Sequence, residues 1–495
     1  MKMVNSFAFM EDKTRSTIAQ VLISIAKYLI TLNAALMVLY PTTALPLWLQ
    51  GNDGVKIDEY WAPFIVPTQY ASLILGTLCS GFAAKWGKKP LIFITMIFAE
   101  IGWFECYMVQ DIWLIFFSRL TAGFALGLTV PVNSLLGEAC EPRLRGLLDT
   151  ISSLIMAVGY NIASYMMQLQ SFRNIALVCS IFPIITVIYS YFMPESPLWL
   201  CTQQRYDEAL KALVWLRGWK YNEQIKKEYE QLCNYCAQNM REQTIDLTEI
   251  NDDIEINQNR RLNFLKIERK NFEKFSKNLW DNLKYMSKAE MLKPTLIISI
   301  VQFFACATPN GILITYLPLL VLQVNPEAPA ATIMIIYTTA SLIIHTVGAI
   351  LVPFVGKKVL ILISMAGSAS GCILVAVYDI CIDLVANNYW LFTAVIVILQ
   401  CFISIGPANL SYTLIGELFP IRGRVLGTVI SSTVATVYIM ILTLISLPLL
   451  NSVRLYIVMT IYCGLYILGF IYFKIFFKET EGKTLELIQK EMSSE

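Results

Sequence analysis

The alternation of apolar and charged stretches constrains this chain more than any other feature of its sequence. Two long apolar regions flank a polar stretch, 194–292, which holds about two-fifths of all Asp, Glu, Lys and Arg. A helix that crosses a bilayer needs about 20 mostly apolar residues, and windows of that kind recur throughout both regions. The pattern therefore predicts a membrane protein in which a large polar connector joins two apolar halves.

Twelve apolar segments are long enough to cross a bilayer, six before the connector and six after it. Because unpaired backbone amides are not tolerated in lipid, segments of this length are helices rather than strands. The predicted fold class is an all-α membrane protein with two six-helix bundles. The expected spans are 20–49, 62–84, 91–109, 112–137, 147–170, 172–193, 294–323, 329–355, 358–384, 389–418, 425–450 and 454–477.

The same pattern divides the chain into four parts. We expect an N-terminal bundle at 1–193, a connector with short helices at 194–292, a C-terminal bundle at 293–478 and a tail at 479–495. Lys and Arg gather in alternate loops, on the side that also holds the connector and both termini. By the positive-inside rule, we expect both termini and the connector in the cytoplasm.

Composition argues against several other classes of protein. The chain is 56% hydrophobic and 15% charged, whereas soluble proteins have about 25% charged residues. A net charge of +2 without a basic patch gives no reason to expect a nucleic-acid partner. Cys233 and Cys236 form an isolated C-x-x-C, for which we expect no metal. No nucleophile–base set indicates an enzyme, and no cofactor is expected.

Short motifs recur in the same order in the two apolar halves. A glutamate precedes an arginine by seven residues in LLGEACEPRLRG (135–146) and in LIGELFPIRGRVLG (414–427). A Gly-Lys-Lys turn separates the second and third spans of each half. Internal repeats of this kind are typical of secondary transporters, whose halves rock about a site near the bilayer midplane.

Several of these motifs resemble those of the sugar porter family of the major facilitator superfamily, and within it the insect facilitated trehalose and glucose transporters. The resemblance covers nearly the whole chain except about 235–290. It implies a monomer in a bilayer that carries a small neutral polar solute, a hexose or trehalose, by alternating access. The motifs are YPTTALP (40–46), SRLTAGFALG (118–127), GEACEPRLRG (137–146), PESPLWL (194–200), RYDEALKALVWLRG (205–218), GELFPIRGRVLG (416–427) and ETEGKTLELI (479–488).

Charged residues at the inner ends of the spans are candidates for a gate. Ion pairs among them would stabilise the outward-open state and would part for inward opening. The alternative is that these charges only set the topology at the lipid interface. The candidates from the residue pattern are Glu138, Arg145, Lys85, Lys88, Arg119, Glu417, Arg424 and Lys357, and the resemblance adds Glu195 and Glu479 as acceptors.

The loop after the second span departs from the family's pattern. The resemblance implies an acid and several arginines there, whereas AKWGKK (84–89) has alanine in place of the acid and lysine in place of each arginine. Because lysine lacks the bidentate geometry of arginine, we expect a looser inner gate than in relatives that keep the pattern.

A sugar site needs many hydrogen-bonding partners and an apolar or aromatic face for the ring. The resemblance places such groups in spans 5, 7, 8, 10 and 11, although the family's glutamine is replaced by Ser153 and its tryptophan by Tyr412. Serine and threonine can instead bond to carbonyls of their own helix, and the tyrosines can be packing residues. The candidate ligands are Gln302, Asn310, Asn409, Tyr412, Ser153, Thr308 and Tyr316.

Two further observations bear on the energy source. His345, the only histidine, lies inside the eighth span and is either a functional group or a neutral side chain satisfied between helices. The core of span 1 holds no acid, where proton-coupled relatives carry one, and Glu100 and Glu105 are the nearest alternatives. We therefore expect facilitated uniport, in the plasma membrane. A proton-coupled symporter and a transporter-like nutrient sensor with little flux are the alternatives.

Overall fold

The computed structural model describes residues 2–219, 223, 225–234, 236, 289–382, 388–406, 424–477 and 479. Some of the sequence-based predictions fall outside this description. They concern Asn409, Tyr412 and Glu417 entirely, and Glu138, Arg145 and Arg424 in their side chains.

Helices account for nearly all of the described structure. Eleven are long and apolar enough to cross a membrane, and Tyr389–Ile405 is a shorter apolar helix at the place of the tenth expected span. Because the described residues contain no strand, the predicted all-α fold class is confirmed. The long helices are α1 (Lys2–Gln50), α2 (Ala62–Ala83), α3 (Lys88–Tyr107), α4 (Ile112–Leu128), α6 (Pro142–Met166), α7 (Phe172–Tyr191), α12 (Ala289–Cys306), α13 (Asn310–Val324), α14 (Ala330–Val355), α15 (Lys357–Ile380), α16 (Tyr389–Ile405), α18 (Arg424–Ser452) and α19 (Leu455–Phe476).

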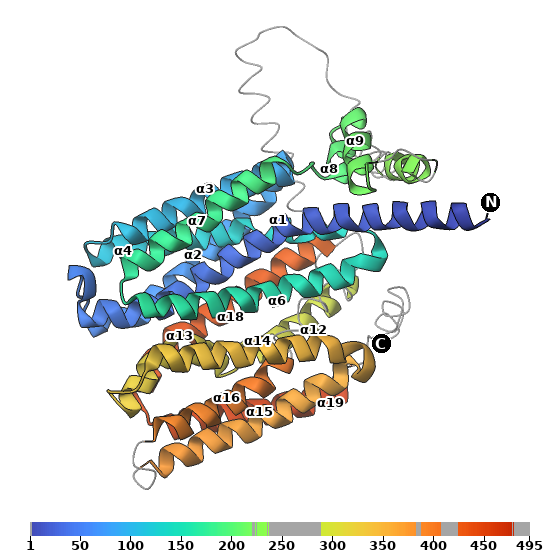
Figure 1. Cartoon of the computed structure of the whole chain (residues 1–495). Coiled ribbons are helices and arrows are strands. Elements are labelled where there is room, and N and C mark those ends of the chain that lie inside the picture. The colour runs from blue at the N-terminus through green and yellow to red at the C-terminus, as the bar shows by residue number, and fades with distance from the viewer. Residues whose placement is uncertain are drawn as a thin grey trace, which may run out of the picture.

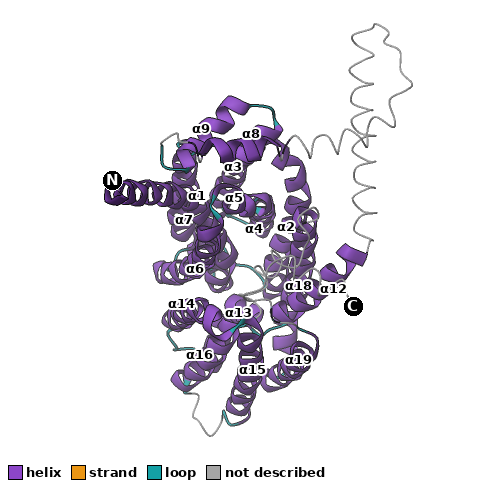
Figure 2. Ribbon diagram, turned by 90° about the vertical axis from the view of Figure 1, so that its right-hand side faces the viewer, coloured by secondary structure: helices purple, strands orange, loops and turns teal. Residues whose placement is uncertain are grey.

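The helices form two bundles that lie side by side (Figure 1). Corresponding helices make corresponding contacts: α3 packs on α7 as α15 packs on α19, and α2 packs on α4 as α14 packs on α16. Between the bundles, α2 contacts α18, α6 contacts α14 and α1 contacts α13. Figure 2 shows these neighbouring helices nearly end-on. The repeated motifs of the sequence therefore correspond to repeated packing.

Large apolar side chains are exposed on many of these helices. Leu75, Phe104, Ile188 and Leu468 each leave more than half of their surface uncovered. Apolar exposure on this scale marks an interaction surface in a protein. Lipid is the partner that fits helices of this length.

The first helix is longer than the sequence predicts. It begins at Lys2 rather than near residue 20, and it continues through Pro41 and Pro46. Its N-terminal part extends beyond the bundle on the side of the connector (Figure 1), where α1 contacts α5 (Leu135–Ala139) and α9 (Tyr206–Leu216). The apolar window alone could not predict this, because Ser16 and Gln20 in this part of α1 are polar and bond to Glu141, which is distant in the sequence.

The seventh expected span is broken into two helices. Helix α12 ends at Cys306 and α13 begins at Asn310, directly after Pro309. Proline lacks a backbone N–H and disfavours helical geometry in the residue before it, so the ladder stops and Thr308 N–H bonds to Cys306 O at 2.8 Å instead. The break lies among buried residues, where interrupted helices expose backbone groups for binding.

The described part of the connector folds into short helices. Helix α8 (Pro197–Thr202) is followed by α9, and a third helical segment covers 225–234. Helix α9 ends at Leu216, two residues before Gly218, which adopts a φ of +91°. A Cβ at Gly218 would stand 2.7 Å from that of Arg15, so a glycine allows α1 to approach closely.

Candidate functional site

The start of α3 is held by a carboxylate from the connector. Glu195 accepts the backbone N–H of Lys88 and that of Lys89, both at 2.9 Å. A helix N-terminus carries unpaired N–H groups and a partial positive charge, and a carboxylate satisfies both. Glu195 also accepts the N–H of Ser196 at 2.8 Å, so the first turn of the connector is fastened to α3.

The second half repeats this arrangement. Glu479, after the last span, accepts the N–H of Lys357 at 3.2 Å and that of Lys358 at 2.9 Å, at the start of α15. We call Glu195 and Glu479 the capping glutamates. The residue before each helix is a glycine with positive φ, and a Cβ there would stand 2.6–2.8 Å from the carboxylate.

The lysine side chains near these caps bond to backbone carbonyls. Lys88 Nζ donates to Pro131 O at 2.8 Å, and Lys89 Nζ donates to Tyr191 O at 2.5 Å and to Met193 O at 3.1 Å. The Lys89 contacts tie the start of α3 to the end of α7, and the Lys88 contact ties it to the turn after α4. They lie within the N-terminal bundle.

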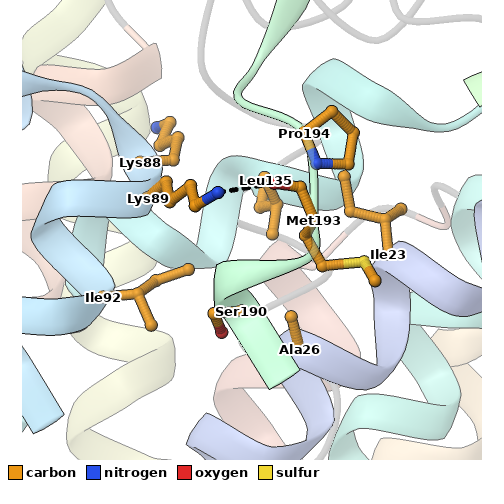
Figure 3. Close-up of a pocket in the computed structure, with 9 residues that line it drawn as sticks. All are labelled: Ile23, Ala26, Lys88, Lys89, Ile92, Leu135, Ser190, Met193 and Pro194. Atoms are coloured by element: carbon orange, nitrogen blue, oxygen red, sulfur yellow. Dashed lines mark hydrogen bonds between the residues drawn. The ribbon is translucent and has the colours of Figure 1, made fainter. Parts of the chain in front are cut away.

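A small cavity opens beside these lysines (Figure 3). It has a volume of about 10 Å³ and is lined by apolar side chains of α1 and α3, by Ser190 and by the Lys88–Lys89 turn. This is barely room for one water molecule. The cavity therefore fits no sugar.

The structure does not bring Arg119 to the inner surface, where the sequence analysis placed it. Its side chain is fully buried in the N-terminal half of α4. Its guanidinium donates to Gln69 Oε1 at 3.1 Å and to Cys106 Sγ at 2.7 Å. The guanidinium also lies 4.9 Å from the centre of the Tyr40 ring. Counting along α4 explains this, because Arg119 follows Ile112, the end of the helix remote from the connector, by only two turns.

A row of polar contacts, which the sequence pattern did not predict, joins α1 to the start of α6. Gln20 and Ser16 both donate to Glu141 Oε1, at 3.0 and 2.7 Å. About two turns further along both helices, the buried Lys27 forms an ion pair with Asp149 at 2.8 Å. An ionisable residue inside an apolar span is a functional candidate by default, so Lys27 could have been found by that signal.

Hydrogen bonds join the two bundles on the side remote from the connector. Asn161 Nδ2 on α6 donates to Thr339 Oγ1 at 2.7 Å and to Thr338 Oγ1 at 3.3 Å on α14. Thr42 Oγ1 on α1 donates to Ile314 O on α13 at 2.9 Å. We call these contacts the remote clasp. They connect α6 with α14 and α1 with α13 at that end of the molecule.

A connected polar network lies inside the C-terminal bundle. The Tyr337 hydroxyl donates to Asn310 Oδ1 at 2.8 Å and to Gln400 Oε1 at 2.7 Å, sharing one proton between two amide oxygens. Gln400 Nε2 donates to Ser341 Oγ at 3.1 Å. His345 Nδ1 lies 2.9 Å from Ser341 O, so the histidine is bonded at one ring nitrogen. The network fixes the amide of Asn310 at the start of α13.

The remaining predicted ligands differ in their surroundings. Gln302 is buried in α12, four residues before the break, and its Oε1 has no hydrogen-bond partner among the described residues. Thr308 is buried within the break. Tyr316 is fully buried and makes a long bond of 3.5 Å to Thr443 O, which favours a packing role. Ser153 is exposed on α6.

Comparison with known proteins agrees with this architecture. A family model described as "Sugar (and other) transporter" matches residues 61–492. The facilitated trehalose transporter Tret1 of Bombyx mori is 24% identical over 450 residues, which are 89% of this chain and 80% of that protein. Tret1 of Polypedilum vanderplanki is 30% identical over 166 residues, 33% of this chain and 32% of that protein, so that match spans about a third of either length.

Solved structures of similar fold come from the xylose transporter XylE. Its partially occluded inward-open conformation, from E. coli, aligns with a TM-score of 0.71 at 14% identity and covers 94% of this chain and 99% of that chain. The proton:xylose symporter XylE bound to 6-bromo-6-deoxy-D-glucose aligns with a TM-score of 0.67 at 15% identity, covering 97% of this chain and 100% of that one. At these identities the likeness concerns the fold.

Proposed function

The chain belongs to the sugar porter family of the major facilitator superfamily, and from this premise we propose that it is a facilitative (uniport) carrier of a hexose or trehalose. It is a multi-pass membrane transporter and not an enzyme. Trehalose is favoured as a substrate because similar curated proteins are facilitated trehalose transporters. We place the protein in the plasma membrane, with both termini and the connector in the cytoplasm.

The observation that supports the proposal is the buried amide oxygen of Gln302, which has no hydrogen-bond partner among the described residues and lies near the break between α12 and α13. A buried polar atom without a hydrogen-bond partner destabilises the protein by about 1–3 kcal/mol. A hydrogen bond from a solute hydroxyl would offset this cost. Asn310 is the first residue of α13, directly after the break, and its Oδ1 is held by Tyr337. Two amides flanking exposed backbone groups suit a solute that is rich in hydroxyls.

Alternating access is supported by the remote clasp. In this conformation Asn161 and Thr42 close the bundles at the end away from the connector. Solute would therefore reach the site from the connector side, and opening of the clasp would admit it from the other side. Hydrogen bonds of this size are enough to bias an equilibrium between two states of similar free energy.

Uptake of radiolabelled trehalose and glucose into vesicles that contain the purified protein tests the proposal. We expect saturable uptake that stops at equal concentrations inside and outside. Gln302→Ala should raise KM about tenfold, the loss of one good hydrogen bond. Gln168→Ala, which removes an exposed amide at the far end of the N-terminal bundle, should leave KM unchanged. Binding without flux would identify a sensor instead, and accumulation against the gradient would identify a symporter.

A further inference from the structure

Three cysteines of the connector converge, although the sequence separates one of them from the other two. Cys201 lies at the end of α8, and Cys233 and Cys236 lie on the helical segment that follows α9. Cys201 and Cys236 belong to the same buried cluster, and Cys233 packs against that cluster. All three are free thiols. The isolated C-x-x-C of the sequence is therefore part of a three-thiol cluster.

The cluster sits in a small apolar core that holds the connector together. Leu200, Ala209 and Ala212 surround Cys201 and Cys236, both of which are buried. Cys233 is partly exposed at the edge of this core. An oxidant from solution can therefore reach Cys233 before it reaches Cys201, which is buried.

Burial gives the three thiols different roles. Desolvation, with the neighbouring thiols adding to it, raises the pKa of Cys201 to about 12, so this thiol stays protonated and is slow to react with an oxidant by itself. Desolvation also raises the pKa of Cys236. The proximity of Cys201 to Cys233 suits it to the second step of oxidation, in which it resolves a sulfenic acid on Cys233 and gives up its proton to the leaving oxygen.

We propose that Cys233 and Cys201 form a redox-sensitive pair that closes into a disulfide and joins α8 covalently to the helical segment 225–234. Hydrogen peroxide, the oxidant class that we assign, oxidises the Cys233 thiolate to a sulfenic acid and is itself reduced to hydroxide. The Cys201 thiol then attacks that sulfur, an S–S bond forms, and the sulfenic oxygen leaves as water. Over both steps two thiols and one peroxide give one disulfide and two water molecules.

A disulfide between Cys201 and Cys233 would link two parts of the connector that are attached to the N-terminal bundle at different places. Helix α8 begins directly after Ser196, whose N–H is bonded to the capping Glu195. The helical segment 225–234 is anchored separately, because Arg217 forms an ion pair of 2.6 Å with Glu228 and donates to Ala139 O on α5 at 3.2 Å. A disulfide would join these two attachments covalently. In the reducing cytosol such a bond would be transient, as in redox sensors.

Peptide mapping of the purified full-length protein tests the pair. The protein is exposed to hydrogen peroxide, its free thiols are alkylated, and it is digested with trypsin without reduction. We expect the peptide with Cys201 to be joined to the peptide that holds Cys233 and Cys236, and a dithiol reductant should separate them. In the untreated protein, Cys201 and Cys233 should both be found alkylated.

Variants distinguish the two candidate partners of Cys201. The joined peptide should fall about tenfold in Cys233→Ser, the thiol that reacts first, and less than about twofold in Cys236→Ser. Cys381→Ser, which removes a partly exposed thiol of the C-terminal bundle, should change nothing. Retention of the joined peptide in Cys233→Ser would overturn the pairing. Alkylation of Cys201 in the peroxide-treated wild-type protein would overturn the site itself, and this measurement needs no variant to fold.

Discussion

Glu195 and Glu479 hold equivalent places in the two halves, because each carboxylate accepts two backbone N–H groups at the start of the third span of its half. Each glutamate belongs to the segment that follows the last span of that half. The connector and the tail are therefore fastened in the same way to the loops between the second and third spans. Since each contact lies within one bundle, it can persist while the bundles rock against each other.

Removing a capping glutamate should destabilise the protein. Glu195→Ala and Glu479→Ala each leave two helix N–H groups without their acceptor and remove a negative charge from a helix N-terminus, at a cost of about 1 kcal/mol. The apparent melting temperature of the purified protein measures this. Glu208→Gln, in an exposed ion pair with Arg205, is the matched control and should change stability by less than about 0.5 kcal/mol. Equal melting temperatures for Glu195→Ala and Glu208→Gln would contradict the capping role.

The glycines before these helices should be intolerant of any side chain. Gly87 and Gly356 have φ of +107° and +84°, and an added Cβ would press on the carboxylate of Glu195 or Glu479. Alanine at either position should destabilise the protein by about 1–3 kcal/mol. Gly464→Ala is the control with the opposite sign: the site is open and helical, and alanine should stabilise it by about 0.5–1 kcal/mol. Thermal shift measurements that gave all three variants the same sign would refute this explanation.

The positions of these contacts show what the sequence could predict. Runs of apolar residues predict the spans, because the bilayer sets their length, and the repeat of Gly-Lys-Lys predicts two equivalent turns. The acceptor role of Glu195 was expected from the resemblance. Its partners on α3 are backbone N–H groups, however. Because every residue except proline has a backbone N–H, the sequence does not indicate which ones the glutamate binds.

The network around Tyr337 could not be predicted for a different reason. Tyr337, Asn310 and Gln400 lie on three helices, and no spacing along the chain indicates that they meet. In the sequence, a tyrosine in an apolar span cannot be told from a packing residue such as the fully buried Tyr316. Arg119 is the opposite case, because its distance from the helix end was available in the sequence and places it away from the inner gate.

Removing the Tyr337 hydroxyl should weaken both stability and solute binding. Tyr337→Phe leaves the buried amide oxygens of Asn310 and Gln400 without their donor, which costs about 1–3 kcal/mol. Because Asn310 also loses its orienting contact, KM for the transported sugar should rise several-fold with little change in kcat. Tyr316→Phe removes a hydroxyl with only a 3.5 Å contact and serves as the control. An unchanged melting temperature and KM in Tyr337→Phe would show that the network has neither role.

Removing the remote clasp should open the interface at that end. Asn161→Ala deletes two hydrogen bonds between the bundles, and a loss of about 1 kcal/mol shifts the population about fivefold towards the open state. Spin labels introduced through unnatural amino acids at Asp58 and Glu327, both exposed in loops at that end, report the separation of the bundles. The long-distance population should grow in Asn161→Ala and stay constant in Asn174→Ala, an exposed asparagine at the same end. A constant distribution in Asn161→Ala would remove the clasp from the mechanism.

Transport should not depend on a proton gradient. Arg119 is held by Gln69, Cys106 and the Tyr40 ring, and no carboxylate lies within ion-pair distance of it among the described residues. A proton-coupled carrier needs an acid that loads and releases a proton as the bundles move, and α1 presents none beside Arg119. A protonophore should therefore leave the final sugar level in vesicles unchanged. The acids that could contradict this are Glu100 and Glu105 on α3, since each has one buried oxygen without a partner. If sugar accumulates against its gradient, and Glu105→Gln or Glu100→Gln abolishes the accumulation while equilibrating uptake persists, the carrier is a symporter with its proton site on α3.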